Sequence, residues 1–289
     1  MSDSAAPSVE VEFRKVSYRA AGRDGNSTEI LHSLSLTLHR GETLVLLGRS
    51  GSGKTTALKL VNRLLEPSEG EVLVENRSTR IWDPIRLRRR TGYVIQESGL
   101  LPHFSVERNI AMVPRLERWT HDRIDTRVEE LLRLVGLEPA DFRRRFPREL
   151  SGGQRQRVGV ARALAADPPL LLMDEPFGAL DPITRAALQR EFRALQQQLH
   201  KTVILVTHDL REALMLGTRI ALLDSGRLVG VFSPDEFLRA TDPAAAAYVA
   251  AFRLSGLDTV GEISDRSIST HELPRVFSQE QRPDSDSGH

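Results

Sequence analysis

The sequence of 289 residues contains no cysteine, which excludes disulfide bonds and thiolate metal sites and fits a reducing compartment. It has no apolar run near the roughly 18 to 20 residues that a membrane span requires. Its first eight residues have neither a basic segment nor an apolar core, so they do not indicate a signal peptide. The net charge of +1 gives no overall field that would attract nucleic acid. We therefore expect a soluble chain that reaches a membrane only through a partner.

The remaining composition is ordinary for a globular protein, with 40% hydrophobic and 27% charged residues. The length allows one large domain or two small ones, with a sizeable core, and we find neither internal repeats nor a second large domain. Residues 9–252 are expected to form this domain, after a flexible N-terminus at residues 1–8. Residues 253–289 are rich in polar side chains, which predicts a largely flexible tail.

The most informative stretch is a glycine-rich motif between a predicted buried strand at residues 44–47 and a predicted helix at residues 56–65. This order is the context that the phosphate-binding motif G-x-x-x-x-G-K-[ST] requires, and it argues against the alternative of a glycine turn with a surface lysine. The motif consists of Gly48, Arg49, Ser50, Gly51, Ser52, Gly53, Lys54 and Thr55.

The chemistry of this motif suits a nucleoside triphosphate. Glycines let the backbone curl so that several N–H groups point at phosphate oxygens. The start of the following helix adds a partial positive charge at the same place. Lys54 can reach the β- and γ-phosphates, and the hydroxyl of Thr55 can bind Mg²⁺.

Two further predicted strands also end in polar residues. Residues 170–173 lead into Asp174 and Glu175, and residues 202–206 lead to His208. Because ligands bind at the carboxyl ends of parallel strands, these side chains are expected beside the glycine-rich motif. Asp174 can hold the water shell of Mg²⁺, and Glu175 can act as a general base. Taken singly, the acidic pair could begin a loop and the histidine could be structural, but their context favours contact with the phosphates.

The overall pattern predicts an α/β fold. Apolar runs separated by helices indicate a mainly parallel core sheet with helices on both faces. Alternating residues at 9–13 and 34–38 predict antiparallel strands beside the nucleotide site, and residues 220–229 predict a hairpin. Residues of about 97–166 have a helical pattern and should form an inserted lobe. The arginine run at 85–90 indicates a solvated helix face more than a nucleic-acid patch.

With these motifs in place, the chain resembles the ATP-binding subunit of an ABC transporter. Residues 150–154, Leu-Ser-Gly-Gly-Gln, match the signature of that family without departure, and the match as a whole covers roughly residues 9–252. Gln96 matches the Q-loop, residues 179–181 match the D-loop, His208 matches the switch histidine, and Tyr18 matches the aromatic residue that stacks on adenine. No catalytic position departs from the family pattern.

The resemblance implies a P-loop NTPase cassette with a mainly parallel core sheet, an N-terminal antiparallel β subdomain and an inserted helical subdomain. It implies ATP hydrolysis with Glu175, His208 and Gln96 as catalytic residues, and Mg²⁺ held by Thr55, Gln96 and Asp174. The other ATP contacts that it implies are Tyr18, Gly48, Arg49, Ser50, Gly51, Ser52, Gly53, Lys54, Thr55, Thr56, Ser151, Gly152, Gly153, Gln154 and Asp181.

The resemblance also implies an assembly. Two copies would meet head to tail, with each ATP between the glycine-rich motif of one copy and residues 151–154 of the other. A serine and glycines at a helix start form an anion site, which supports such a sandwich. The implied partners are integral membrane permease subunits and, indirectly, an external substrate-binding protein. The chain would lie peripherally on the cytoplasmic face of the inner membrane, without nucleic acid.

Residues 96–103 and 174–185 are similar to importers of glycine betaine, choline and related osmoprotectants, although importers of sulfonates, nitrate or polyamines share much of this pattern. Only a short stretch follows Phe252, so we expect neither the paired nucleotide-sensing module of many such proteins nor its ionic-strength regulation. A soluble ABC ATPase acting on nucleic acid or ribosomes is the alternative, but those usually carry two cassettes or inserted modules. A P-loop kinase would have no reason to carry residues 150–154.

Overall fold

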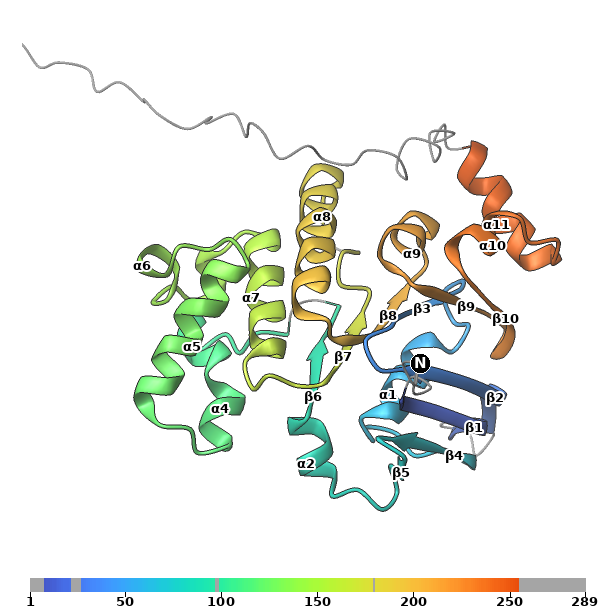
Figure 1. Cartoon of the computed structure of the whole chain (residues 1–289), viewed down its shortest axis with the longest axis horizontal. Coiled ribbons are helices and arrows are strands. Elements are labelled where there is room, and N and C mark those ends of the chain that lie inside the picture. Colours follow the sequence, from blue (N-terminus) through green and yellow to red (C-terminus); the bar gives the residue numbers. More distant parts are fainter. Residues whose placement is uncertain (1–7, 22–26, 97–98, 179, 255–289) are drawn as a thin grey trace, which may run out of the picture.

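The computed structural model describes residues 8–21, 27–96, 99–178 and 180–254 of the chain (Figure 1). The predicted N-terminal flexible segment, except for Ser8, and nearly all of the predicted tail lie outside these residues, as does Ala179 of the D-loop match. The described part contains two β-sheets with helices packed around them. No helix within those four ranges has both the length and the apolarity needed to cross a membrane.

The first sheet is antiparallel and has the strand order β2-β1-β4-β5. Its long strands alternate buried and exposed residues because only one face packs on the core, as the alternation at 9–13 and 34–38 predicted. Val11 and Phe13 of β1 and Leu36 and Leu38 of β2 are buried. The strands of this sheet are β1 (Val9–Ala21), β2 (Ser27–His39), β4 (Glu69–Val74) and β5 (Arg77–Ser78).

The second sheet has the strand order β10-β9-β3-β8-β7-β6, and every neighbouring pair except β10 and β9 is parallel. Its central strands are buried along their whole length because helices or the first sheet cover both faces, which explains their continuous apolar runs. The predicted mainly parallel sheet is confirmed. Its strands are β3 (Thr43–Leu47), β6 (Thr91–Val94), β7 (Leu170–Asp174), β8 (Thr202–Thr207), β9 (Arg219–Asp224) and β10 (Arg227–Phe232).

The strand register brings the functional strand ends to one edge of this sheet. Leu47, the last residue of β3, pairs with Thr207 of β8, and Asp174 of β7 pairs with Val206. The predicted hairpin is also present, with Ser225 and Gly226 at its turn between β9 and β10, both at positive φ as a two-residue type I′ turn requires.

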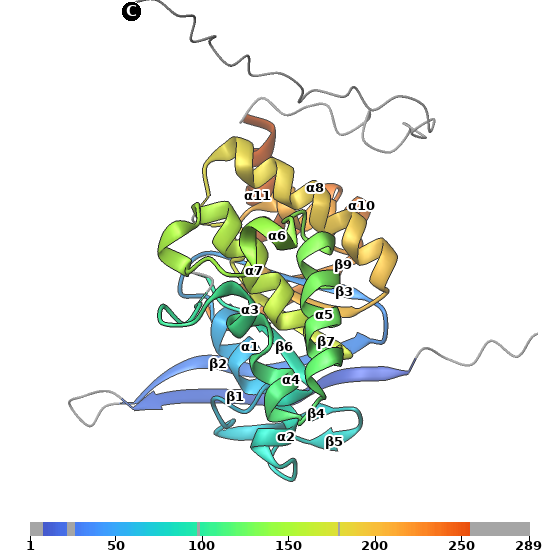
Figure 2. The same cartoon turned by 90° about the vertical axis from the view of Figure 1, so that its left-hand side faces the viewer.

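Helices fill the chain between β6 and β7 and form the predicted inserted lobe, which gathers at one side of the molecule (Figures 1 and 2). Its longest helix, α5, buries Ile124, Val128, Leu131 and Leu132, and it ends two residues before Gly136, where the sequence predicted a stop. The lobe contains α3 (Val106–Ile110), α4 (Met112–Leu116), α5 (His121–Leu134), α6 (Pro139–Phe142), a 3-10 turn at Pro147–Glu149, and α7 (Gly152–Leu164).

The remaining helices cover the two sheets. The predicted helix at 56–65 begins two residues earlier and ends at Val61, where Asn62 and the positive φ of Arg63 stop it. The predicted arginine-rich helix is present, with Arg86 and Arg88 exposed as a solvated face requires. These helices are α1 (Lys54–Val61), α2 (Pro84–Arg89), α8 (Pro182–Leu199), α9 (Leu210–Leu216), α10 (Pro234–Leu238) and α11 (Pro243–Leu254).

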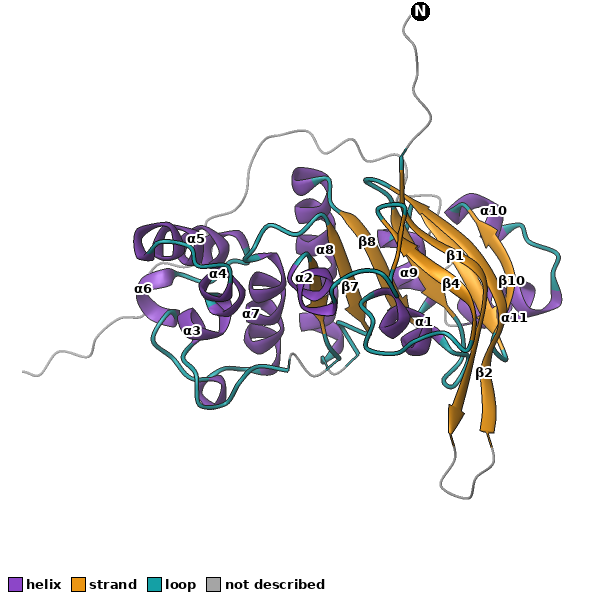
Figure 3. Ribbon diagram, turned by 90° about the horizontal axis from the view of Figure 1, so that it is seen from below, coloured by secondary structure: helices purple, strands orange, loops and turns teal. Residues whose placement is uncertain are grey.

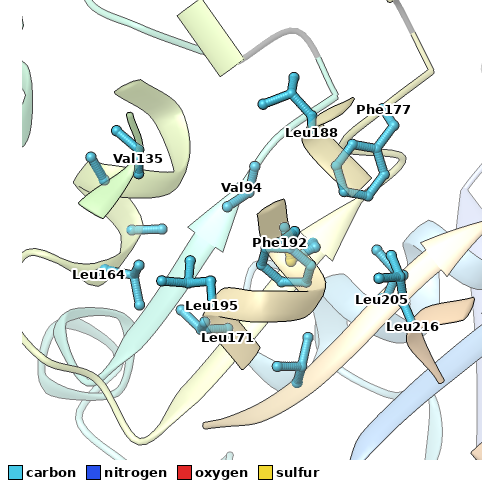
Figure 4. Packing of buried hydrophobic residues seen from close by; sticks show 14 of the residues in the cluster. Val94, Val135, Leu164, Leu171, Phe177, Leu188, Phe192, Leu195, Leu205 and Leu216 are labelled. Atoms are coloured by element: carbon cyan, nitrogen blue, oxygen red, sulfur yellow. The ribbon is translucent and has the colours of Figure 1, made fainter. Parts of the chain in front are cut away.

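The parallel sheet divides the interior into two hydrophobic clusters. Val45 and Leu47 of β3 face one cluster, while Leu44 and Leu46 face the other, as the strand period of two residues dictates. The first cluster packs under α7, α8 and α9, and Figure 4 shows Phe192 and Leu195 of α8 lying close to residues of the strands beneath. The second cluster lies around α1, between the two sheets. Seen from below, the first sheet lies at the right, β7 and β8 lie in the middle, and the lobe helices lie at the left (Figure 3).

Candidate nucleotide site

The glycine-rich motif forms a tight loop between the end of β3 and the start of α1. Gly51 and Gly53 have φ angles of +81° and +94°, in the region that glycine adopts readily. A Cβ atom on Gly48 would lie 2.3 Å from the carbonyl oxygen of Leu223, so the loop passes too close to β9 for any side chain there. The sequence therefore builds a curled backbone at the start of a helix, as the motif predicted.

Lys54 lies inside this loop. Its ammonium group donates hydrogen bonds to the carbonyl oxygens of Gly48 and Arg49, each at 2.8 Å, and the residue is only 5% exposed. Burial lowers the pKa of Lys54, and the nearby carboxylates of Glu175 and Asp174 oppose that shift. Within the described residues the hydroxyl of Ser52 is also buried and has no hydrogen-bond partner. A buried cation and a spare hydroxyl in a curled loop fit an oxyanion ligand such as a phosphate.

Asp174 connects the end of β7 to the first turn of α1. The hydroxyl of Thr55 donates a 2.9 Å hydrogen bond to Oδ1 of Asp174. Burial raises the pKa of the Asp174 carboxyl, while the Thr55 hydrogen bond opposes the shift. Mg²⁺ binds proteins through one or two oxygen ligands and completes its octahedron with phosphate oxygens and water. The hydroxyl of Thr55 and the carboxylate of Asp174 fit that requirement.

Glu175 lies next to Asp174, and its carboxylate contacts two of the predicted catalytic side chains. Nε2 of Gln96 donates to Oε2 of Glu175 at 3.3 Å, and Nδ1 of His208 lies 3.4 Å from Oε1. Glu175 is held at a φ of +43°, and its backbone N–H donates to the carbonyl oxygen of Val206 on β8. The fold thus brings the ends of β6, β7 and β8 together on a single carboxylate.

The residues that match the ABC signature lie elsewhere, at the start of α7. Ser151 caps that helix, because its hydroxyl accepts from the N–H of Gln154 while its own N–H donates to the Gln154 side chain. Ser151 and Gly152 are exposed, whereas Gly153 is buried. Asp181 is also exposed and caps α8 by accepting from the N–H groups of Ile183 and Thr184. Helix α7 packs on β6, while α1 packs between the sheets against β4 and β8.

The remaining predicted contacts surround the loop. Arg49 and Ser50 are exposed, and Thr56 is half-buried in the first turn of α1. Tyr18 is half-buried in β1 and pairs with Leu31, whose side chain would lie 2.6 Å from a Cβ on Gly53. Tyr18 is therefore one cross-strand pair away from the loop, which is compatible with contact to a bound base.

Two groups near the site were not predicted. Tyr93 of β6 is half-buried, and burial together with the carboxylate of Asp174 raises the pKa of its phenol. Glu212 of α9 is 4% exposed and accepts hydrogen bonds from Gln189 and Thr207. Tyr93 stands three residues before Gln96, and Glu212 stands four after His208, so proximity to the motifs was the available signal for both.

The comparison with known families assigns the class of protein. The family model described as ABC transporter matches residues 31–178, and the chain belongs to this family. The solved structures agree. A dimeric ATP-binding cassette in a post-hydrolysis state, bound to ADP and Pi, is similar with a TM-score of 0.70 and 32% identity, covering 78% of this chain and 98% of that one. The predicted cassette fold is confirmed.

The curated relatives indicate a subgroup within this family. The chain is 51% identical over 209 residues to the glycine betaine/carnitine/choline transport ATP-binding protein of Bacillus subtilis, covering 72% of this chain and 55% of that protein. It is 52% identical over 204 residues to the ATP-binding protein of a glycine betaine uptake system of Escherichia coli, covering 71% and 66% respectively. The chain thus spans between about half and two thirds of the length of these relatives. The predicted resemblance to the osmoprotectant group is confirmed.

Proposed function

We propose that this chain binds Mg²⁺-ATP and hydrolyses it as the ATP-binding subunit of an importer for small quaternary amines such as glycine betaine or choline. The observation that carries this proposal is the Glu175 carboxylate, held between Gln96 and His208 beside the Thr55–Asp174 pair. Such a constellation at the carboxyl edge of a parallel sheet suits attack of water on a phosphate.

Each side chain has a role that its position supports. Glu175 accepts a proton from the attacking water, and His208 and Gln96 fix the direction of its carboxylate. Lys54 exchanges its two carbonyl partners for phosphate oxygens, which offsets the cost of its burial. Thr55 and Asp174 would hold Mg²⁺, which neutralises phosphate charge when bound.

The proposal includes a homodimer. Ser151 and Gly152 are exposed at the start of a helix of 13 residues, whose N–H groups and dipole favour an anion. These residues belong to the inserted lobe, whereas the phosphate loop of the same chain follows the carboxyl end of β3 at the edge of the parallel sheet. A second copy placed head to tail would bring this helix start to the phosphates and would place Asp181 at the contact.

The names of the curated relatives support the transport part of the proposal. The chain would bind permease subunits from the cytoplasmic face of the inner membrane as a peripheral subunit, and an external binding protein would present the solute. Sulfonates, nitrate and polyamines remain alternative solutes to be tested. Action on nucleic acid or ribosomes is less well supported, because the named relatives are transport proteins.

The variant Glu175→Gln tests the catalytic part of the proposal. Loss of a general base should lower the rate of ATP hydrolysis by about 10²- to 10⁴-fold, while nucleotide binding is retained. Because ATP then persists, analytical ultracentrifugation should show an ATP-dependent dimer. Glu66→Gln is the matched control, since Glu66 is an exposed carboxylate paired with Arg63 and should leave both properties unchanged. Hydrolysis by Glu175→Gln at the wild-type rate would refute the assignment of the general base.

The variant Glu175→Gln also tests the proposal that the chain is a subunit of a transporter. Tagged Glu175→Gln protein with Mg²⁺-ATP should co-purify a multi-span membrane protein from the native membrane fraction. The reconstituted complex should then take up labelled glycine betaine or choline in an ATP-dependent manner. Uptake of only a sulfonate, nitrate or a polyamine would show that the proposed solute is wrong. Recovery of only ribosomal or nucleic-acid proteins would overturn the proposal that the chain is a transporter subunit.

A further inference from the structure

Glu212 is a buried carboxyl group that the proposed chemistry does not use. It lies in the first turn of α9, and its side chain joins two other buried polar groups. Nε2 of Gln189 donates to its Oε1 at 2.9 Å, and the hydroxyl of Thr207 donates to its Oε2 at 2.6 Å. The exposed fractions of Glu212, Thr207 and Gln189 are 4%, 2% and 3%, so water contributes little to satisfying these groups. A buried network that is satisfied in this way fixes the elements that carry it.

The network holds the chain on both sides of His208. Thr207 precedes the histidine, and its hydroxyl oxygen also accepts a 3.0 Å hydrogen bond from the N–H of Asp209, which follows it. Asp209 in turn caps α9 by accepting from the N–H of Arg211 at 2.8 Å. The turn that carries the histidine is therefore closed by a single hydroxyl, and Glu212 holds that hydroxyl in place.

Gln189 anchors the network to a rigid element. It lies on α8, whose Leu188, Phe192 and Leu195 are buried in the hydrophobic core. The same helix begins at its cap Asp181. Burial raises the pKa of Glu212, while its two hydrogen-bond donors oppose that shift.

The ring of His208 depends on this turn because little else surrounds it. Its side chain is 60% exposed, whereas that of its partner Glu175 is 22% exposed. An exposed ring has no packed walls to fix its direction, so its 3.4 Å approach to Glu175 follows from the backbone that carries it. We infer that Glu212, acting through Thr207 and anchored by Gln189, is a positioning residue that aims His208 at the Glu175 carboxylate. This inference rests on the proposed ATP hydrolysis.

Two pairs of variants separate positioning from simple loss of stability. Thr207→Ser keeps the hydroxyl and Thr207→Val removes it at nearly the same volume. Glu212→Gln keeps two polar groups that can bond Gln189 and Thr207, and Glu212→Leu keeps neither. Glu10→Gln is the control for altering a buried carboxylate, because Glu10 lies on β1, is 2% exposed and pairs with Arg40 in the turn after β2.

Two experiments are made on the full chain. Enzyme kinetics give kcat and the nucleotide affinity, and NMR of protein with labelled histidine rings gives the signal of His208. The His208 signal is assigned among the eight histidines with the variant His208→Gln. Thr207→Val and Glu212→Leu should shift the His208 signal and lower kcat by about 10- to 100-fold, with nucleotide affinity nearly unchanged. Thr207→Ser, Glu212→Gln and Glu10→Gln should retain the wild-type signal and most of kcat.

Folded Thr207→Val and Glu212→Leu proteins with the wild-type kcat and an unshifted His208 signal would overturn the inference. An equal decrease of kcat in all five variants would also overturn the inference, because that result indicates general destabilisation. If Glu212→Leu does not fold, the Thr207 pair decides. If the wild-type chain does not hydrolyse ATP, the proposed function fails, and the His208 signals alone decide whether the network aims the ring.

Discussion

Gly51 and Gly53 of the phosphate loop allow the cost of backbone strain to be measured separately from the cost of a steric clash. Both have positive φ, at +81° and +94°, but their surroundings differ. A Cβ on Gly51 would have no heavy atom within 4 Å. A Cβ on Gly53 would lie 2.6 Å from Cδ2 of Leu31 and 3.0 Å from the carbonyl oxygen of Ile30. Alanine should therefore cost different amounts at the two positions.

The size of the difference follows from these surroundings. Alanine at either position adopts a left-handed conformation, which costs about 1–2 kcal/mol. At Gly53 the methyl group also overfills a packed region, which adds about 1–3 kcal/mol because Leu31 is fully buried and the Ile30 carbonyl is backbone. Gly51→Ala should thus destabilise by about 1–2 kcal/mol and Gly53→Ala by about 2–5 kcal/mol.

Thermal unfolding of the chain without nucleotide measures this difference directly. Each kcal/mol corresponds to about 2–4 °C in Tm for a domain of this size. Leaving out nucleotide keeps lost phosphate contacts from contributing to the result. Equal shifts for the two variants would refute the argument, because they would mean that Leu31 and the Ile30 carbonyl move aside without cost.

Two further predictions concern Asp174 and the helix caps. Asp174→Asn should raise Tm without nucleotide at pH 7, because burial raises the pKa of this carboxyl and its charged form is costly. The gain in Tm should shrink as pH falls through the raised pKa and vanish below the ordinary value of about 3.9. Thermal unfolding of both proteins at pH 7 and in acid measures this change. A gain that does not depend on pH would contradict the prediction. Ser151→Ala should cost about 1 kcal/mol as a lost cap and should also weaken ATP-dependent dimerisation. Ser233→Ala removes the same type of capping box from α10 and should give a similar stability loss with no change in sedimentation, whereas equal effects on the dimer would argue against Ser151 at the interface.

The sequence predicted most of the parallel sheet because its central strands are covered on both faces. Residues such as those of β3 and β8 are apolar without interruption, and that pattern requires little knowledge of their neighbours. The polar residues that follow β7 and β8 were found for the related reason that parallel strands end at one edge. The glycine-rich motif carries its own local geometry, so its loop and helix could be assigned within a few residues.

The groups that were not predicted depend on contacts between distant residues. Gln189 and Glu212 are 23 residues apart, and nothing in either local pattern pairs them. Periodicity can indicate that a segment is helical, but it does not show which buried side chain of one helix meets which side chain of another. The position of β3 between β8 and β9 is likewise set by packing of the whole sheet. The end of α1 was predicted four residues late because Leu64 and Leu65 continue the apolar spacing beyond the positive φ of Arg63.

The hydrogen bonds at the start of α7 have a consequence for the lifetime of any contact made there. The hydroxyl oxygen of Ser151 accepts from the N–H of Gln154, and the N–H of Ser151 donates to the Gln154 side chain, so the cap is formed before any ligand arrives. The hydroxyl can still donate its proton to a phosphate oxygen, so the cap does not have to break when such a contact forms. A hydrogen bond to a charged group contributes about 1.5–3 kcal/mol, so departure of the phosphate removes a contact of that size. If two copies bind one ATP through this serine, hydrolysis of the γ-phosphate removes the contact that joins them. The two copies can then separate and bind new ATP.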